Sequence, residues 1–377
     1  MGHSRKRADK QRKTLKVQVP DQARDRASTE VVGDLRMIDQ AAYDRKHRLY
    51  QQAVQSPKGD ISYMLRFFRE NIGMQAPVHL REDFCGTAAI SATWCKSDVR
   101  RTATGVDLDA QALRWGWQNN ACSLLGGSAA RVCLVHSNVL SDIAEGPVVR
   151  TTGADLSGPA LSDLQAAEHA NKACHDDDGA RSDCCDAETD DLRCKPADIV
   201  CFFNFSVCLL FTRSDVLRYF RHVRQAINPE GGVFVLDLLG GPAAEVNARI
   251  QRRNDVTGMT YLWEQVGYNP VTRHIHTYIT LCDPETKQVL PRAFAYHWRL
   301  WTLPDVLELL RQAGFPLVEV WLRPIKDAGA EQTGMADGED TDYERYDLKG
   351  SNAELIGSVQ GGWTAYVVAV VPGDASV

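Results

Sequence analysis

The feature that most constrains the fold is a regular alternation, from about residue 77 onward, of short apolar runs and longer amphipathic stretches. The apolar runs are "PVHLRED", "TATGVDL", "ARVCLVHS", "ADIVCFFNF" and "GVFVLDLLG". Between them, "TAAISATWCKS", "AQALRWGWQNNACSLL" and "RSDVLRYFRHVRQAI" carry apolar residues at helical spacing. This alternation predicts parallel βαβ units and hence an α/β fold with a doubly wound, mostly parallel sheet of the seven-stranded type. Such sheets bind ligands at the carboxyl ends of their strands.

A second pattern follows the fifth apolar run. Over residues 255–302, "MTYLWEQVGYN", "RHIHTYITLCD" and "RAFAYHWRLW" predict an added segment of three successive antiparallel strands. After them, "TLPDVLELLRQAGF" predicts an amphipathic helix with Thr302 as its N-cap and Gly314 as its stop. "PLVEVWLR" and "TAYVVAVV" predict the two closing strands.

Charge and composition divide the chain into regions. Residues 1–30 hold nine Lys or Arg against four acids, so 1–37 is predicted to be a disordered basic tail. Residues 38–76 show two helical patterns and are predicted to form a helical lid. The main domain would cover 77–377, interrupted at 146–196 by an acidic insertion, since residues 153–199 hold twelve acids and four bases.

The composition excludes several classes of protein. A 44% hydrophobic and 24% charged chain without an apolar run of roughly 18 residues predicts a soluble protein with no membrane partner. Its predicted location is cytoplasmic, with a nuclear or organellar one left open, and its 11 cysteines are expected to be reduced. No metal site is predicted, because Cys174, His175, Cys184, Cys185 and Cys194 lack a Cys-x-x-Cys spacing.

Five motifs in order carry a resemblance to a known family. "LREDFCGTA", "ATGVDLD", "HSNV", "INPEGGVFVLD" and "LWTLPDVLELLRQAGF" together resemble the class I S-adenosylmethionine-dependent methyltransferases, from about Val78 to Val371 apart from the insertion. The resemblance implies a Rossmann-like fold, S-adenosyl-L-methionine as the cofactor, and a small molecule as the first choice of methyl acceptor. RNA or protein, reached through the basic tail, stays open as an acceptor. The alternative is an inactive methyltransferase-like scaffold that binds RNA or protein.

The resemblance assigns the first loop, whose family pattern is acid-x-Gly-x-Gly-x-Gly. It places Glu82 at the acid, where it would meet the methionine ammonium group, with Asp83 as the alternative acid. Phe84, Gly86 and Ala88 occupy the three glycine positions, and Cys85 and Thr87 complete the cofactor loop. Only Gly86 is kept as glycine, so ordinary backbone angles are expected at Phe84, whose ring would line the pocket or fill the core.

Two further strand ends extend the predicted cofactor site. Asp107 would accept hydrogen bonds from the ribose hydroxyl groups, and Leu108 would border the adenine. Asn138 would accept from the adenine amino group, with Val139 beside it. Asp109 is expected to be the N-cap of the next helix rather than a ligand.

The fourth strand end, at Asn204, faces the expected position of the reactive methyl group, so Asn204 is a candidate both for the cofactor and for positioning the acceptor. Tyr50 on the lid is a second acceptor-positioning candidate. Glu264 and Arg299 are two more, because charges inside apolar strands are unusual unless they pair with each other or meet a ligand. Trp263, His297 and Trp298 lie beside them in the sequence.

Overall fold

The computed structural model describes residues 40–141, 143, 146, 148–149, 192–254, 257, 259–325, 343–347 and 352–373. The chain divides into two compact units, residues 1–43 and 44–377, and both sheets belong to the second. The predicted basic tail at 1–37 lies outside the described residues. So does most of the predicted insertion at 146–196, including Cys174, His175, Cys184 and Cys185.

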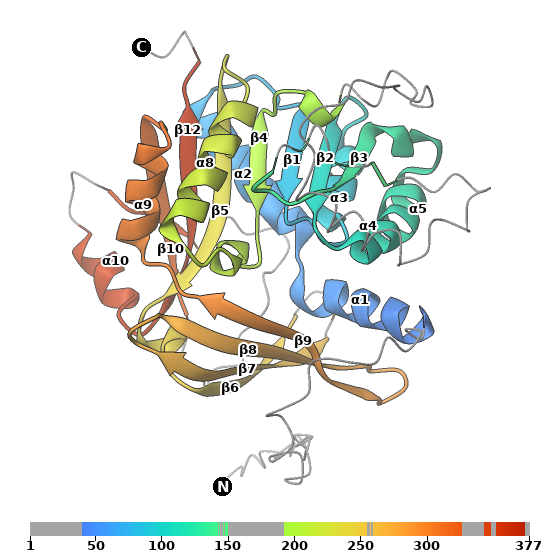
Figure 1. Ribbon diagram of the computed structural model, residues 1–377, viewed down its shortest axis with the longest axis vertical. Helices are drawn as coiled ribbons and strands as arrows, with labels where there is room; N and C mark the ends of the chain where they lie inside the picture. The colour runs from blue at the N-terminus through green and yellow to red at the C-terminus, as the bar shows by residue number, and fades with distance from the viewer. Residues whose placement is uncertain are drawn as a thin grey trace, which may run out of the picture. The chain divides into compact units, whose positions relative to one another are not determined.

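The larger of two sheets has eight strands in the order β11-β10-β12-β5-β4-β1-β2-β3 (Figure 1). Strands β1 to β5 are parallel, while β12 is antiparallel to both of its neighbours, β5 and β10. The bounds of the strands are β1 (His79–Asp83), β2 (Thr102–Asp107), β3 (Val132–His136), β4 (Ile199–Phe202), β5 (Gly232–Gly240), β10 (Leu317–Pro324), β11 (Glu344–Arg345) and β12 (Trp363–Val371). This is a Rossmann-like, doubly wound and mostly parallel sheet, as the alternation predicted. Because β1 pairs with both β2 and β4, the chain reverses its direction across the sheet at β1.

Helices cover both faces of this sheet (Figure 1). Met64, Phe67 and Phe68 on one face, together with Trp94, share one apolar cluster, whereas Tyr219 and Val306 share a second one. The bounds of the helices are α1 (Gln40–Val54), α2 (Pro57–Asn71), α3 (Ala89–Ser97), α4 (Ala110–Gly116), α5 (Ser123–Leu125), α8 (Arg213–Ala226), α9 (Leu303–Gln312) and α10 (Ala353–Ser358), with shorter turns at Trp117–Cys122 (η2, a π-helix), Gly126–Arg131 (η3), Ser206–Leu209 (η5) and Pro242–Ala244 (η6). Thr302 caps α9 through the Asp305 amide, and Gly314 follows that helix with a φ of 97°, both as predicted. No helix of the described part is long and apolar enough to cross a bilayer.

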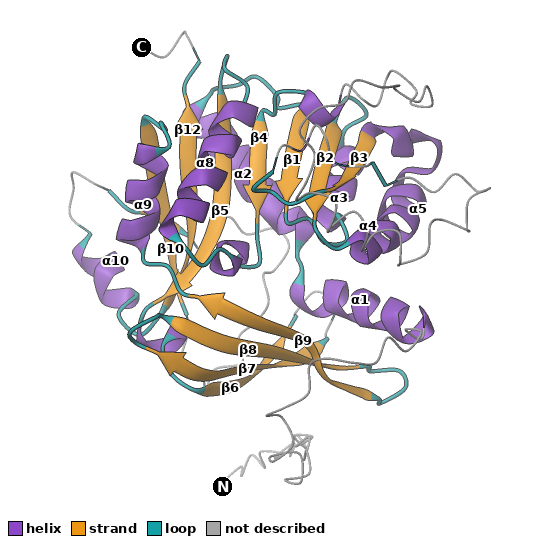
Figure 2. Cartoon of the chain, viewed as in Figure 1, coloured by secondary structure: helices purple, strands orange, loops and turns teal. Residues whose placement is uncertain are grey.

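The second sheet contains the predicted antiparallel strands and one more. Its order is β6-β7-β8-β9, with bounds β6 (Ala248–Arg253), β7 (Thr260–Asn269), β8 (His274–Cys282) and β9 (Val289–Arg299). Strand β6, "ARIQRR", has a single large apolar residue and therefore shows no alternation that would reveal it in the sequence. The carboxyl ends of β1, β2 and β4 point toward this second sheet (Figure 2).

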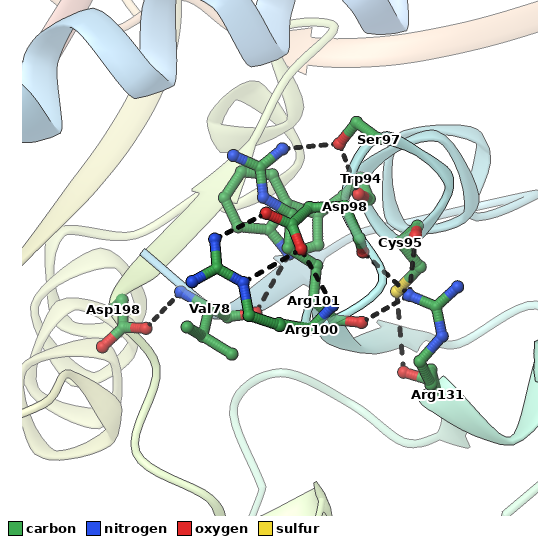
Figure 3. Close-up of polar contacts among 9 residues, drawn as sticks. All are labelled: Val78, Trp94, Cys95, Ser97, Asp98, Arg100, Arg101, Arg131 and Asp198. Carbon is green, nitrogen blue, oxygen red and sulfur yellow. Dashed lines mark hydrogen bonds and ion pairs between the residues drawn. The ribbon is translucent and has the colours of Figure 1, made fainter. Parts of the chain in front are cut away.

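Two arginines, Arg101 and Arg131, hold the carboxyl end of α3 and the turn that leads from it to β2 (Figure 3). One guanidinium nitrogen of Arg131 donates to the carbonyl oxygens of Cys95, Asp98 and Arg101, at 2.6, 3.0 and 2.9 Å. The Arg101 guanidinium lies over the Trp94 ring at 3.8 Å. The carbonyl groups of Cys95 and Asp98 are among those that a helix leaves unpaired at its carboxyl end, so the bonds from Arg131 help to hold α3 in place.

Candidate functional site

A cavity of about 640 Å³ lies at the carboxyl ends of β1 to β4. Its wall includes all the residues that the sequence predicted for the cofactor, namely Glu82, Phe84, Cys85, Gly86, Thr87, Asp107, Leu108, Asn138, Val139 and Asn204. Residues of α1 and β9 close its other side, among them Tyr50 and Tyr296. The volume lies in the usual range for a small-molecule or cofactor site.

The loop between β1 and α3 has a left-handed backbone at every second residue. Phe84, Gly86 and Ala88 all have a φ of 52°, which L side chains rarely adopt. The expectation of ordinary angles at Phe84 is therefore wrong. These are the three positions that are glycine in the pattern acid-x-Gly-x-Gly-x-Gly given above. The loop therefore keeps a glycine-type backbone there, although two of the three residues carry side chains. The left-handed conformation costs a non-glycine residue roughly 1–2 kcal/mol.

The Phe84 ring both packs in the core and lines the cavity. It lies edge-on to the rings of Phe202 and Tyr219, with centroid distances of 5.6 and 5.7 Å. It is also part of the wall of the larger cavity. Burying most of an aromatic ring contributes on the order of 2 kcal/mol, enough to offset the strained backbone angle.

Thr87 is held from two sides. Its hydroxyl oxygen accepts from the side-chain amide of Gln51 on α1 at 2.8 Å. Its carbonyl oxygen accepts from the side-chain amide of Asn120, in the π-helical turn η2, at 2.7 Å. Neither partner was predicted, since isolated amides in helical stretches carry no sequence signal. The two bonds tie the loop to α1 and to η2.

The two adjacent acids of β1 have different surroundings. Glu82 is 5% exposed and lines the cavity, and one of its oxygens, Oε2, accepts from both the amide and the hydroxyl of Ser91, at 2.8 and 2.6 Å. Burial raises the pKa of Glu82 to about 7, although the bonds from Ser91 act in the opposite direction. Asp83 instead pairs with Arg81 at 2.8 Å and accepts from the Tyr219 hydroxyl at 2.9 Å. Of the two, Glu82 is thus the acid available to a ligand.

Asp107, at the end of β2, ties the cofactor loop to the next helix. One carboxylate oxygen accepts from the Gly86 amide at 2.6 Å and the other from the Asp109 amide at 2.8 Å. Burial raises the pKa of Asp107. Asp109 caps α4 through the amides of Gln111 and Ala112, as predicted, and Leu108 is 62% exposed beside the cavity.

Asn138 and Val139 form the wall beyond β3. The Asn138 side-chain oxygen accepts from the Leu140 amide at 2.9 Å, which orients the side-chain amide. A carbonyl-type oxygen has two lone pairs, so this bond leaves acceptor capacity for a ligand. Val139 is 4% exposed and forms an apolar part of the wall.

A smaller cavity of about 200 Å³ adjoins the larger one. The two share Tyr50, Gln55, Phe203, Asn204, Tyr296 and Trp298. Asn204 and Phe205, directly after β4, are again left-handed, with φ of 61° and 60°. Two successive non-glycine residues in this conformation are a rare local strain, of a kind that clusters at functional sites.

Two acids of the smaller cavity were not predicted. Asp237 of β5 accepts from the Phe205 amide at 2.8 Å, and Asp60 of α2 accepts from the Tyr366 hydroxyl at 2.9 Å. Tyr366 lies directly opposite Asp237 on the neighbouring strand. Burial raises the pKa of Asp60 to about 7 and that of Asp237 well above its usual range, and the nearby charge of Asp60 raises the pKa of Asp237 further.

Glu264 and Arg299 do not line either cavity, so the structure does not bring them to the site where the sequence predicted them. Glu264 lies 3.8 Å from Arg249 and 3.9 Å from Arg292, and Arg299 donates to the Phe211 carbonyl oxygen at 2.5 Å. The reason is strand alternation, since Trp263 and Trp298 face the cavity and their neighbours therefore face away. His297 likewise stacks on His276, outside both cavities.

No protein-family model and no curated protein matches the sequence. Among solved structures, the chain is similar to an S-adenosylmethionine-dependent methyltransferase from Clostridium acetobutylicum, with a TM-score of 0.46 and 12% identity over 87% of this chain and 98% of that one. It is also similar to the CcbJ methyltransferase from Streptomyces caelestis, with a TM-score of 0.45 and 12% identity over 83% of this chain and 90% of that one. A sugar N-methyltransferase from Streptoalloteichus gives a TM-score of 0.43 at 13% identity, and the match covers 91% of this chain and 97% of that one.

Proposed function

We propose that the protein is an S-adenosylmethionine-dependent methyltransferase that acts on a small molecule. The observation that carries the proposal is a pair of adjoining cavities at the strand ends where the chain reverses across the sheet. The larger one has acids at two successive strand ends, and the smaller one shares Tyr50 and Asn204 with it. A cofactor in one and an acceptor in the other would meet at these shared residues.

The larger cavity fits the cofactor on the evidence of its own polar groups. Among the described residues, both donors to Glu82 reach Oε2, so its other oxygen is available to an ammonium group. A buried acid whose pKa is raised to about 7 and which lines a cavity is stabilised as a carboxylate by an incoming cation. Each carboxylate oxygen of Asp107 accepts one hydrogen bond from a backbone amide, and its remaining lone pairs can accept from hydroxyl groups of a ligand. Bound there, the cofactor would supply an electrophilic methyl group, and the protein's task would be to align the acceptor with it.

Substituting Asp107 by asparagine is expected to weaken S-adenosylmethionine binding by about 10–100-fold. The substitution removes one charged hydrogen-bond acceptor and points an N–H group at a backbone amide, and each charged bond contributes about 1.5–3 kcal/mol. Isothermal titration calorimetry with S-adenosylmethionine and S-adenosylhomocysteine measures the change. Asp98→Asn, a partly exposed acid at the other end of the sheet, is the control and should leave both affinities unchanged. A folded wild-type protein that binds neither compound would overturn the proposal.

The affinity for S-adenosylmethionine is expected to rise with pH and to level off above about pH 7. With the pKa of Glu82 raised to about 7, its carboxyl group is protonated in the free protein below that pH and must lose its proton to pair with an ammonium group. The expected slope is about tenfold per pH unit below 7, measured by calorimetry at three pH values. In Glu82→Gln the affinity should be lower and this slope should be lost, whereas an unchanged slope would exclude Glu82 as the titrating group.

A further inference from the structure

The smaller cavity has polar groups of opposite charge that come from different parts of the fold. Asp237 and Asp60 belong to β5 and α2, on the side of the large sheet. Arg252 and Arg253 belong to β6, the edge strand of the antiparallel sheet. Arg323, the remaining arginine of the wall, lies close enough to Asp60 to lower the pKa of that acid. The cavity therefore offers Asp237 to a cation and Arg252 to an anion.

Asp237 is the acid without a cationic partner. Its carboxylate is held by backbone amides, of which Phe205 donates at 2.8 Å, and no ion pair joins it to a Lys or Arg in the described part of the chain. The Phe205 amide belongs to the strained turn that also places Asn204 between the two cavities. Asp237 thus stands next to the boundary that a transferred methyl group would have to cross.

Aromatic rings form much of the wall around these acids. Tyr296 stacks on Trp298 with a centroid distance of 5.3 Å, and Trp298 lies 5.6 Å from Trp263. Tyr50 and Phe203 add two more rings. The faces of aromatic rings attract cations, most strongly where water is excluded, so this wall favours an organic ammonium group over a neutral hydroxyl group.

Arg252 is the group of the smaller cavity that could bind the anionic end of a ligand. Its guanidinium lies over the Trp263 ring at 5.1 Å. Its Nε is buried and has no hydrogen-bond partner among the described residues. A buried donor without a partner is costly, and a carboxylate or another planar anion would satisfy it.

We propose that the methyl acceptor is a small zwitterion, with its amine held at Asp237 and its acidic group held at Arg252. This inference rests on the proposed methyltransferase function and specifies its acceptor. The amine enters as an ammonium ion, and one of its N–H protons passes to the Asp237 carboxylate. The freed nitrogen lone pair then forms a bond to the methyl carbon while the carbon–sulfur bond breaks and its electron pair stays on sulfur. The products are a methylated ammonium ion, a neutral thioether and a protonated Asp237.

Burial supports this role for Asp237, since a carboxyl group with a raised pKa binds a proton more readily than a surface acid does. The groups around Asp237 shift its pKa in both directions. Asp60 raises its pKa, and the amides of Phe205 and Asn204 lower it. Tyr50, Tyr343 and Tyr366, whose own pKa values burial raises, stay neutral and add no charge.

The test uses two matched sets of acceptor candidates with the full-length protein and S-adenosylmethionine. The sets are β-alanine, propylamine and 3-hydroxypropanoate, and phenylalanine, 2-phenylethylamine and 3-phenyllactate. Formation of S-adenosylhomocysteine and of the methylated product is followed by mass spectrometry. Methylation of at least one amino acid on nitrogen, with kcat/KM about tenfold or more above that of the matched amine, is the expected result.

Two variants separate the two ends of the site. Asp237→Asn is expected to lower kcat for the accepted amino acid by about 100-fold. Arg252→Met is expected to raise the KM for the amino acid by about 10–100-fold and to change that for the matched amine little. The controls are Glu308→Gln, an exposed acid on α9, and Arg249→Met, an exposed arginine on β6. Calorimetry with S-adenosylmethionine confirms that each variant is folded and binds the cofactor.

The outcomes distinguish this inference from the proposed function. If the wild-type protein binds S-adenosylmethionine but methylates only a hydroxy acid, or none of the six compounds, the zwitterion proposal is overturned and the cofactor assignment stands. Full activity of Asp237→Asn on an amino acid would overturn the role of Asp237. Absence of cofactor binding by the folded protein would remove the basis of both.

Discussion

Replacing Arg81 by methionine is expected to lower the free energy of unfolding by about 3–5 kcal/mol. The Arg81 Nε and an Asp83 carboxylate oxygen are 2.8 Å apart, and their side chains are only 8% and 0% exposed. Asp83 also accepts from the buried Tyr219 hydroxyl, directly beside the loop that carries Phe84. Removing the arginine leaves a buried carboxylate without its ion-pair partner, which is among the most destabilising single changes in proteins.

Urea denaturation of two further variants shows whether the buried charge is the cause. The double variant Arg81→Met with Asp83→Asn removes both charges and keeps an acceptor for Tyr219, so it should recover most of the loss. Arg100→Met breaks a solvent-accessible pair with Asp98 and should lower the stability only slightly, because such pairs contribute little. A loss of that small size for Arg81→Met, or an equal loss in the double variant, would contradict the explanation.

The fold was predictable from strand order, and the residues that line the larger cavity were predictable from strand order together with the family resemblance. Apolar runs separated by helical stretches indicate parallel strands, and the residue after each run must lie at the ligand-binding edge. Glu82, Asp107, Asn138 and Asn204 stand at such strand ends, the resemblance assigned them to the site, and all four line the larger cavity. The choice between Glu82 and Asp83 needed the structure, because two adjacent residues at a strand end differ only in which partners the rest of the fold brings to them.

The lining of the smaller cavity was harder to predict, because it depends on which face of a strand a residue occupies. Glu264 and Arg299 were chosen as charges inside apolar strands, and the same rule applied to "VLDLL" would have selected Asp237. Strand β5 is apolar on both faces, so its single acid was a visible exception. In β7 and β9, Glu264 and Arg299 instead occupy the face opposite to the cavity-lining Trp263 and Trp298. Asp60 carried no signal, since an acid in the first turn of a helix is usual.

The cofactor loop also depends on a glycine outside it, and substituting Gly116 by valine is expected to cost about 3 kcal/mol of stability. A Cβ atom at this buried position of α4 would lie 2.3 Å from the Thr87 carbonyl oxygen and 2.6 Å from its carbonyl carbon. The obstacle is backbone, which cannot turn aside as a side chain can, so the loss lies at the upper end of the usual cost of overpacking. Affinity for S-adenosylmethionine should fall by at least about tenfold, because the loop from Phe84 to Ala88 must move.

The matched control is Gly357→Val in α10, where an added Cβ would have no described atom within 4 Å. Valine and glycine have helix propensities that differ by only about 0.3–0.5 kcal/mol, so this control should change stability little and cofactor affinity not at all. Thermal denaturation and calorimetry measure the two effects separately. Gly116→Val with wild-type stability and wild-type affinity would mean that α4 and the loop can separate freely. In that case the contact between Gly116 and Thr87 would not position the cofactor loop.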